Sequence, residues 1–376
     1  MKHDRAMATG NVFAARGIAK SVTLACFFIL FQLTASGNVF AGVSIRDLSS
    51  LSQNPLSYVD DKTANRPLLP PEEQERLNSE ANIVFFGPWH HEKPHHRKEL
   101  ASWGLQKYKN NPGYDARGRL RTQNWITEIA QNAHINDYSQ QVFPAVTLRN
   151  TDFRILPTNE SHSNHPSFQG AIAFDNLQQS SVPAGTPVFI TLTSKDKKWV
   201  LAETNHIIGW IKAKDVAEVS ADFITSWENG NYITIIRDKT PVSDGLKLLY
   251  AAPLGMLFPA IGESSTKVRI ITAQRGADGK AALLEATVPR SAAAAKPLSF
   301  TPRNVATIAG ELAGGKYGWG DLHGKRDCSS TTRDIFAPFG ILLPRNSIDQ
   351  AGAGRFISLL GLSLGKKEET IIKKGV

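Results

Sequence analysis

The chain has few cysteines, only Cys26 and Cys328 in 376 residues. Cys26 falls in an N-terminal segment with the pattern of a removable secretory signal, so the mature protein would hold Cys328 alone. A single cysteine excludes an internal disulfide, and an unpaired thiol in an oxidising compartment is explained most simply by reactivity. A buried, inert cysteine is the alternative, because free cysteine is often buried.

The longest apolar run near the N-terminus, residues 22–33, is too short to span a bilayer comfortably. Four basic residues precede it: Lys2, Arg5, Arg16 and Lys20. Small residues at 39–41 then offer a cleavage point, so residues 1–41 are predicted to be a signal peptide. We therefore expect a protein of the periplasm or cell envelope with no stable membrane anchor after cleavage. An uncleaved N-terminal anchor is the alternative.

A dense stripe of Lys and Arg interleaved with aromatic residues is also missing, which argues against a nucleic-acid partner. The full chain has 43 Lys and Arg against 34 Asp and Glu, a net charge of +9. Removing residues 1–41 takes away four basic residues and one acidic residue, which leaves 39 against 33 and a net charge of +6. Such modest positive charge suits an anionic cell wall or membrane surface.

Four histidines lie in one short stretch: His90, His91, His95 and His96. His91 and His95 are four residues apart, which on a helix would place two imidazoles on one face for a metal ion. Pro94 lies between them and prevents the regular helix that this geometry needs. We therefore predict a solvated basic loop, and we expect no metal and no other cofactor.

Cys328 has a local setting suited to a nucleophile. Asp327 is a good N-cap for a helix predicted over residues 329–337, and Pro338 and Gly340 mark the end of that helix. Unpaired N–H groups and the positive end of the helix dipole favour thiolate over thiol at such a position. Taken alone, the sequence Asp-Cys-Ser leaves a nucleophile and an inert core cysteine equally open.

The flanks of Cys328 settle this choice. The sequence YGWG occupies positions 317–320, before the cysteine, and LPRNS occupies positions 343–347, after it. With the cysteine motif, these flanks resemble the NlpC/P60 family of cell-wall cysteine peptidases. Members are papain-like enzymes that cut peptidoglycan stem peptides, typically next to D-glutamate.

The rest of the chain resembles the accessory domains of multidomain members. Residues 42–146 contain FFGPWH at 85–90, which is similar to the N-terminal stabilising segment of the family, and helices are predicted around 71–82 and 124–133. The sequences at 151–159 and 209–212 resemble a bacterial SH3 (SH3b) domain, here expected over residues 147–217. Its predicted strands cover 187–193, 199–203 and 207–212. Trp199 and Trp210 either line a ligand groove or belong to the core.

A second SH3-like barrel is expected over residues 218–290, from strand patterns at 231–238, 246–250, 255–261, 268–273 and 281–288. GADG at 276–279 is a hairpin signal. No residue-level repeat between the two barrels is visible in the sequence. An alanine-rich linker at 291–300 precedes a partial catalytic domain at 301–376, which begins with a helix capped by Thr301 and closed by Gly314 and Gly315. The expected fold class is α+β and multidomain: a helical and irregular N-terminal segment, two small β-barrels and the N-terminal half of a papain-like domain.

The resemblance implies roles for six residues. Cys328 would be the nucleophile. A pocket for the free amine of an N-terminal L-alanine and the adjacent D-glutamate would be formed by the others: Tyr317, Trp319, Asp327, Ser329 and Ser347. Peptidoglycan stem peptides or muropeptides are then the expected partners. Alternatively, Asp327 only caps the helix, and Tyr317 and Trp319 only pack.

One expected residue is missing. The family's catalytic histidine lies well beyond the nucleophile, whereas none of the 48 residues after Cys328 is His and the last histidine, His323, is expected to be a loop residue. We therefore expect a C-terminally truncated member whose own activity is open. A non-catalytic wall-binding protein with a degenerate papain-like domain is the alternative, and an acyltransferase or amidase on the same fold is a third reading.

Overall fold

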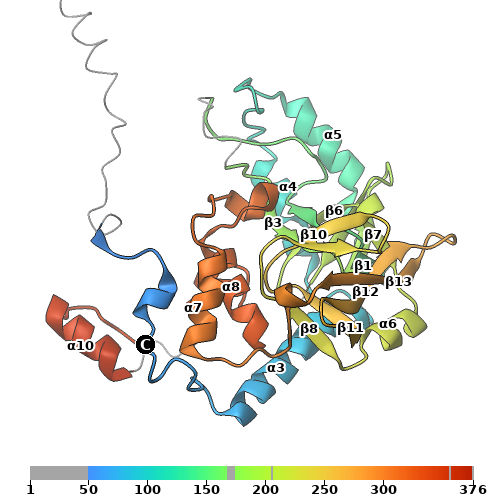
Figure 1. Ribbon diagram of the computed structural model, residues 1–376. Helices are drawn as coiled ribbons and strands as arrows, with labels where there is room; N and C mark the ends of the chain where they lie inside the picture. Colours follow the sequence, from blue (N-terminus) through green and yellow to red (C-terminus); the bar gives the residue numbers. More distant parts are fainter. Residues whose placement is uncertain (1–49, 167–173, 205, 355–356, 375–376) are drawn as a thin grey trace, which may run out of the picture. The chain divides into compact units, whose positions relative to one another are not determined.

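The computed structural model describes residues 50–166, 174–204, 206–354 and 357–374 (Figure 1). Two compact units are distinguished, Met1–Gln53 and Asn54–Val376, and all elements named below belong to the second. The predicted signal peptide at 1–41 lies outside the described residues. Within the described residues, none of the helices has the length and hydrophobicity needed to cross a membrane.

The N-terminal part of the second unit is helical, as expected. Both predicted helices are present, as α3 (Pro71–Phe86) and α5 (Gln123–Ala133), and α4 (Lys98–Tyr108) was not predicted. Short 3-10 turns connect them: η1 (Pro55–Tyr58), η2 (Gly87–His90) and η3 (Ile135–Asp137). α3 begins with Pro71 and two acidic residues, which favour a helix start. It runs four residues past its predicted end, where Phe86 packs into a buried aromatic cluster.

The neighbouring strands of the first sheet pair antiparallel, in the order β3-β2-β6-β5-β4-β1-β7. Its strands are β1 (Phe143–Thr147), β2 (Thr151–Arg154), β3 (Gln178–Val182), β4 (Pro187–Thr193), β5 (Trp199–Glu203), β6 (Ile208–Lys212) and β7 (Val216–Glu218). The three predicted strands are therefore confirmed as β4, β5 and β6. Trp199 and Trp210 are 6% and 1% exposed, so both belong to the core and neither lines an open groove.

The second sheet has the order β10-β9-β13-β12-β11-β8-β14. Its strands are β8 (Tyr232–Ile235), β9 (Thr240–Ser243), β10 (Leu248–Ala252), β11 (Leu257–Glu263), β12 (Lys267–Arg275), β13 (Ala281–Pro289) and β14 (Ala293–Ala295). β9 was not predicted. β14 lies inside the expected linker, so this alanine run is an edge strand paired with β8 and not a free connection. The helix α6 (Ala221–Trp227), capped by Ser220, was also not predicted.

The two sheets have the same strand order when each is counted from its own first strand. Equivalent backbone hydrogen bonds follow from this. Gly185 N–H donates to the carbonyl of Thr147 at 2.7 Å in the first sheet, and Gly255 N–H donates to that of Ile235 at 2.8 Å in the second. Both glycines have positive φ, 73° and 81°. The barrels are therefore a structural repeat, down to single turns.

A buried cluster joins the N-terminal segment to both sheets. Trp89 contributes its ring, and its indole N–H donates to the carbonyl of Ala145 in β1 at 2.7 Å. Phe223 and Trp227 of α6 and Leu257 of β11 pack in the same cluster. Burying large aromatic side chains contributes strongly to stability, so the FFGPWH stretch is fixed between the barrels.

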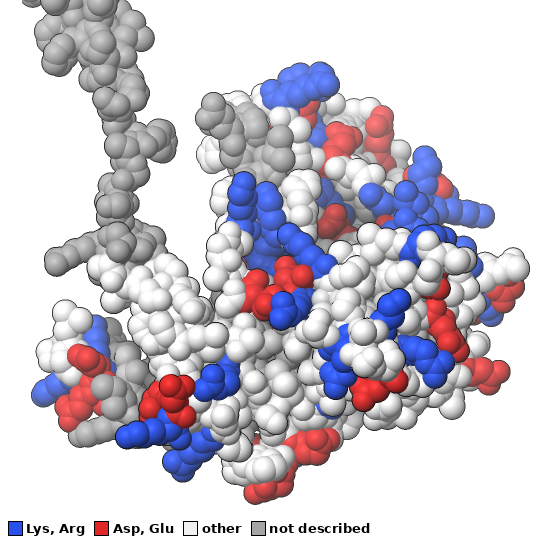
Figure 2. Space-filling model, viewed as in Figure 1, with Lys and Arg blue, Asp and Glu red and all other residues white. Residues whose placement is uncertain are grey.

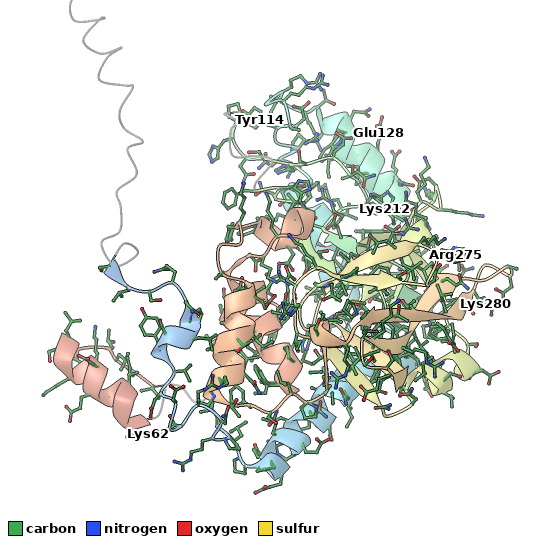
Figure 3. The ribbon with its side chains drawn as sticks, in the orientation of Figure 1. Lys62, Tyr114, Glu128, Lys212, Arg275 and Lys280 are labelled. Atoms are coloured by element: carbon green, nitrogen blue, oxygen red, sulfur yellow. The ribbon has the colours of Figure 1, made fainter. Side chains whose placement is uncertain are left out.

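The β12–β13 hairpin extends to the first sheet, and Figure 3 labels Lys212, Arg275 and Lys280 in this region. Arg275 donates to the carbonyl of Ala213 at 3.3 Å, and Lys280 pairs with Glu218 of β7 at 2.9 Å. The predicted hairpin at 276–279 is confirmed as the turn between these strands. It therefore forms a second contact between the barrels.

The C-terminal segment contains α7 (Pro302–Glu311), η6 (Trp319–Gly324), α8 (Cys328–Phe336), η7 (Ala337–Phe339), α9 (Ser347–Gln350) and α10 (Leu364–Lys374). Thr301 caps α7 as predicted, but the helix ends at Glu311, ahead of the predicted glycine pair. α7 and α8 lie side by side in Figure 1 and are in contact. Ile308, Phe339 and Leu254 form a small core there, which attaches the segment to the second barrel.

Candidate functional site

Cys328 is the first residue of α8, and its thiol is free and exposed. Asp327 is the N-cap, as predicted. Its side chain accepts from Ser330 N–H at 2.9 Å, and the Ser330 hydroxyl accepts from Asp327 N–H at 2.9 Å. This reciprocal capping box fixes the first turn of α8, so the sulfur is held at a helix N-terminus and open to solvent.

Asp327 does more than cap the helix, because its carboxylate is buried and paired with Arg345. Arg345 donates from Nη2 to Oδ2 at 2.7 Å and from Nη1 to Oδ1 at 3.2 Å. Gly320 N–H and the Ser329 hydroxyl, each at 3.2 Å, also donate to the carboxylate. Burial opposes ionisation, but the Arg345 guanidinium and Ser330 N–H outweigh it and lower the pKa of Asp327.

Sequence reasoning missed Arg345, although it lies within the LPRNS stretch. Only 5% of its surface is exposed. Its Nε donates to the hydroxyl of Ser180 at 2.7 Å, and its Nη1 donates to that of Ser329 at 3.0 Å. Ser180 belongs to β3, so Arg345 connects the first barrel to the first turn of α8. The Leu-Pro-Arg sequence gives no sign of this, because its partner is 165 residues away.

The loop before Cys328 lies along the residues that lead into α8. Tyr317 forms a parallel bridge with Arg326, and Gly318 N–H donates to the carbonyl of Arg326 at 2.9 Å. Gln178 of β3 donates to the carbonyl of Gly320 at 2.9 Å. Tyr317 and Trp319 are thereby brought close to Cys328 in the fold.

Tyr317 and Trp319 are 49% and 43% exposed, so neither is a core residue. Phe174, from the connection between β2 and β3, is 51% exposed and lies beside both, with ring centroids 5.9 Å from Tyr317 and 6.2 Å from Trp319. Together the three half-exposed rings form an apolar surface of the kind that binds ligands.

Ser347 is exposed at the start of α9. Its helix is attached to α8 through Gln350, whose amide donates to the carbonyl of Ser329 at 2.8 Å and to that of Pro344 at 2.8 Å. No hydrogen bond joins Ser347 to Cys328 or Asp327 within the described part of the chain. The structure thus brings Tyr317, Asp327 and Ser329 together at Cys328 more directly than Ser347.

A second ion-pair network holds Arg326, the residue before Asp327. Its guanidinium makes two hydrogen bonds to Asp238 of the second barrel, at 2.6 and 3.0 Å, and one to Asp334 of α8 at 2.7 Å. Burial opposes ionisation of Asp238, but Arg326 and the N–H of Leu254 outweigh it and lower its pKa. On the face drawn in Figure 2, basic and acidic side chains are interspersed.

A cavity of about 580 Å³ lies behind this network, lined by parts of α3, both barrels and α8. Asp321 and Arg345 line it, and burial raises the pKa of Asp321. His206 and His323 line it as well, whereas Cys328 does not. His323 lies in the loop before Cys328, as expected, with φ of 59°. Among the described histidines, none hydrogen-bonds the sulfur of Cys328.

His90 is the last residue of η2, and residues 91–96 form a loop, so the predicted absence of a regular helix between His91 and His95 is confirmed. The backbone N–H groups of His95 and His96 donate to the buried carboxylate of Glu203, whose pKa is raised by burial. The rings of His91 and His95 stack with centroids 5.6 Å apart. Across the described residues, no group of three or more His, Cys, Asp or Glu side chains is placed to hold a metal ion.

Three family models match the chain. They are the NLPC_P60 stabilising domain at residues 23–138, an SH3 domain of SH3b1 type at residues 165–212 and an SH3 domain of SH3b2 type at residues 220–265. The first match begins inside the predicted signal peptide, which stays a prediction, as do the expected domain boundaries. No curated protein matches the chain.

Solved structures are similar to it. An NlpC/P60 endopeptidase from Photobacterium damselae subsp. piscicida is similar over 86% of this chain and 75% of its own, with 24% identity and a TM-score of 0.75. An NlpC/P60 family protein from Bacillus cereus is similar over 59% of this chain and 81% of its own, with 16% identity and a TM-score of 0.47. Together with the family models, the first of these confirms the resemblance and the α+β fold class.

Proposed function

We propose, from the premise that this chain is an NlpC/P60-type protein with a stabilising domain and two SH3 domains, that it is a cysteine hydrolase of the bacterial cell wall. Cys328 is the nucleophile. The proposed substrate is a stem peptide or muropeptide with a free L-Ala-D-Glu N-terminus, cut at the D-glutamyl–diamino acid bond in the periplasm. One observation carries this proposal: an exposed, unpaired sulfur at the first residue of a capped helix.

The chemistry proceeds through a thioester. The thiolate of Cys328 attacks the glutamyl carbonyl carbon, and the tetrahedral intermediate collapses by expelling the diamino acid, whose amine takes up a proton. Water then adds to the thioester, which releases the dipeptide acid and returns the thiol. In the enzymes that the sequence resembles, a histidine moves these protons. Among the described residues no histidine hydrogen-bonds the sulfur of Cys328, so we expect slow acylation.

The remaining site residues have proposed roles around this reaction. Tyr317 and Trp319 offer apolar surface to the peptide beside the thiol. Asp327 and Ser329 form the buried layer under Cys328, and Ser347 is placed on the neighbouring α9. We propose that Asp327 also recognises the free amine of the substrate, with its carboxylate paired with Arg345 at the same time.

The test uses purified protein and a synthetic L-Ala-γ-D-Glu-diamino acid peptide. Release of the diamino acid, with a Cys328 thioester seen by mass spectrometry and both signals lost in Cys328→Ala, is the expected result. Alkylation of Cys328 by iodoacetamide is measured in parallel. A thiol that reacts no faster than in the denatured protein, with no thioester, would overturn the nucleophile assignment.

A second function, wall binding without catalysis, is favoured because no histidine in the described part of the chain hydrogen-bonds the sulfur of Cys328. It predicts that the protein pellets with isolated peptidoglycan, that Cys328→Ala pellets equally well, and that no peptide is cleaved. Pelleting by both proteins with release of diamino acid by the parent alone would instead support the hydrolase.

A further inference from the structure

The side chain of Arg345 connects two residues that belong to different parts of the fold. Its Nε bonds Ser180 of the first barrel, and its two terminal nitrogens bond both carboxylate oxygens of Asp327, the residue next to Cys328. We propose that Arg345 is a positioning residue, which neutralises Asp327 and thereby keeps the neighbouring thiol reactive, and that Ser180 of the first barrel holds it in place. This inference rests on the proposed role of Cys328.

The argument begins with charge. Asp327 is needed as the N-cap, but its negative charge lies beside a sulfur that must also become negative. A like charge on the neighbouring residue disfavours the thiolate, whereas a cation nearby favours it. The paired guanidinium cancels the carboxylate charge at short range and leaves the helix N-terminus to act on the sulfur. Arg345 therefore acts on the thiol through Asp327.

No neighbouring group replaces Arg345 in this role. The nearby phenol of Tyr317 is neutral, since partial burial and then the charge of Asp327 raise its pKa. Asp321 lies 3.5 Å from the guanidinium and competes with Asp327 for it. Arg333 approaches Asp321, at 3.7 Å, and is otherwise paired with Asp334. Among the described residues, Arg345 is thus the guanidinium that directly contacts Asp327.

The bond to Ser180 gives the first barrel a part in this arrangement. A guanidinium bonded at Nε and at both terminal nitrogens has one orientation, and here that orientation matches the two oxygens of Asp327. Ser180 is completely buried and lies in the edge strand β3. The barrel thereby sets the geometry of the ion pair beneath the nucleophile.

The experiment measures alkylation of Cys328 by iodoacetamide at pH 7 in folded protein. Arg345→Met is expected to slow the reaction about tenfold, the change that follows from one unit of differential ionisation. Asp327→Asn keeps a good N-cap but removes the charge. The double variant Asp327→Asn/Arg345→Met is therefore expected to return to within about twofold of the parent rate, a rescue that lost packing alone does not allow.

Arg154 provides the matched control. Like Arg345 it is 5% exposed, and it is paired with Asp175 at 2.7 Å and bonded to Gln178 at 3.0 Å. Arg154→Met removes an equally buried guanidinium and a bond to the glutamine that contacts Gly320, but it leaves Asp327 paired, so the alkylation rate is expected to stay within about twofold of the parent. Ser180→Ala removes only the Nε partner and is expected to slow the reaction about twofold to threefold.

Three results would overturn the inference. These are an Arg345→Met protein that reacts as fast as the parent or as Arg154→Met, a double variant that stays slow, and, for the part of the barrel, a Ser180→Ala protein at the parent rate. If Arg345→Met does not fold, the other two variants test the inference. Asp327→Asn is then expected to raise the alkylation rate of Cys328, and Ser180→Ala is expected to lower it. The proposal that Cys328 is the nucleophile fails separately, if the parent thiol is alkylated no faster in the folded protein than in the denatured protein. The inference about Arg345 depends only on the ratio of each variant's alkylation rate to that of the folded parent, so the two failures can be told apart.

Discussion

The two barrels are built alike and used differently. Asn150 and Asp238 occupy equivalent positions, and each accepts a backbone N–H through Oδ1: Ala184 donates to Asn150 at 3.1 Å and Leu254 to Asp238 at 3.0 Å. The remaining polar atom of each side chain has a different kind of partner in the two barrels. The amide of Asn150 donates to the carbonyl of Ala251 in the other barrel, whereas the carboxylate of Asp238 binds Arg326, two residues before Cys328. One repeated turn thus joins the barrels in one copy and holds the segment that leads into α8 in the other.

The edge strands differ in the same way. β3 of the first barrel holds the loop before Cys328 through Gln178 and holds Arg345 through Ser180. The equivalent strand of the second barrel, β10, exposes 64% of Leu248. A long β2–β3 connection also carries Phe174 to the aromatic rings beside the thiol, whereas β9 and β10 are joined by a short hairpin. The two edge strands therefore differ because β3 lies against the segment around Cys328, although both barrels share one strand order.

The largest effect is expected in the two barrel cores. Phe153 and Phe258 are both fully buried, one in each barrel. Phe153→Ala and Phe258→Ala should each lower the free energy of unfolding by about 3–5 kcal/mol, from lost burial and the cavity left behind. Urea denaturation measures both. A single transition in each variant is expected because both barrels share the Trp89 cluster, and two separated transitions would show that they unfold independently.

The next largest effect is expected at Gly185 and Gly255, which occupy equivalent turns in the two barrels. A Cβ on Gly255 would lie 2.9 Å from the Cβ of Ala337 at the end of α8, and one on Gly185 would lie 3.0 Å from the ring of Trp227. Both residues have positive φ. Gly255→Ala and Gly185→Ala should each cost about 2–4 kcal/mol. Only Gly255→Ala should also change the alkylation rate of Cys328, and equal rates in the two variants would contradict this division.

Asp238→Asn gives the second barrel the side chain that the first barrel has at the equivalent position, Asn150. The bond to Leu254 is retained, but the ion pair with Arg326 is lost, at about 2 kcal/mol at pH 7. The pKa of Asp238 is lowered in the folded protein, so its contribution is present above its unfolded value and disappears as pH falls through the folded value. The parent and the variant should therefore converge in stability as the pH falls below about 4. A constant difference measured by thermal unfolding across this range would contradict the assignment.

The smallest effect distinguishes the two edge strands. Gln178→Ala removes the bond to Gly320 together with the bonds to Asp152, Ser180 and Arg154, and should cost about 1–2 kcal/mol. Leu248→Ala in the equivalent strand of the second barrel should change stability by less than about 0.5 kcal/mol, because the side chain is largely exposed. Denaturant titrations of both proteins give the comparison. A larger loss from Leu248→Ala would mean that β10 has a contact that the exposed side chain does not reveal.

Local patterns in the sequence predicted much of this fold. Three strands of the first barrel, β4, β5 and β6, were recognised where apolar residues alternate with polar turns, and the caps Thr301 and Asp327 were recognised because capping depends on residues three apart. Six short strands were missed, since three to five residues show no clear period: β1, β2, β3 and β7 in the first sheet, and β9 and β14 in the second. Their pairing is decided by the neighbouring strands.

The repeat itself could not be read from the sequence, for a reason that the fold explains. Asn150 and Ala184 are 34 residues apart, whereas Asp238 and Leu254 are 16 apart, because the first barrel has a long insertion after β2. The candidate site was predicted only where residues are close in sequence. Arg345 pairs with a serine 165 residues away, and no local period reports such a contact.

Arg326 and Asp327 are consecutive residues, yet each is tied to a different barrel, the first to Asp238 and the second through Arg345 to Ser180. Such an arrangement limits how a gene of this kind can be rearranged. Exchange of either barrel for one from an unrelated protein would remove one of these two contacts, which lie next to Cys328. The barrels and the cysteine segment are therefore expected to be inherited as one unit and not as interchangeable modules.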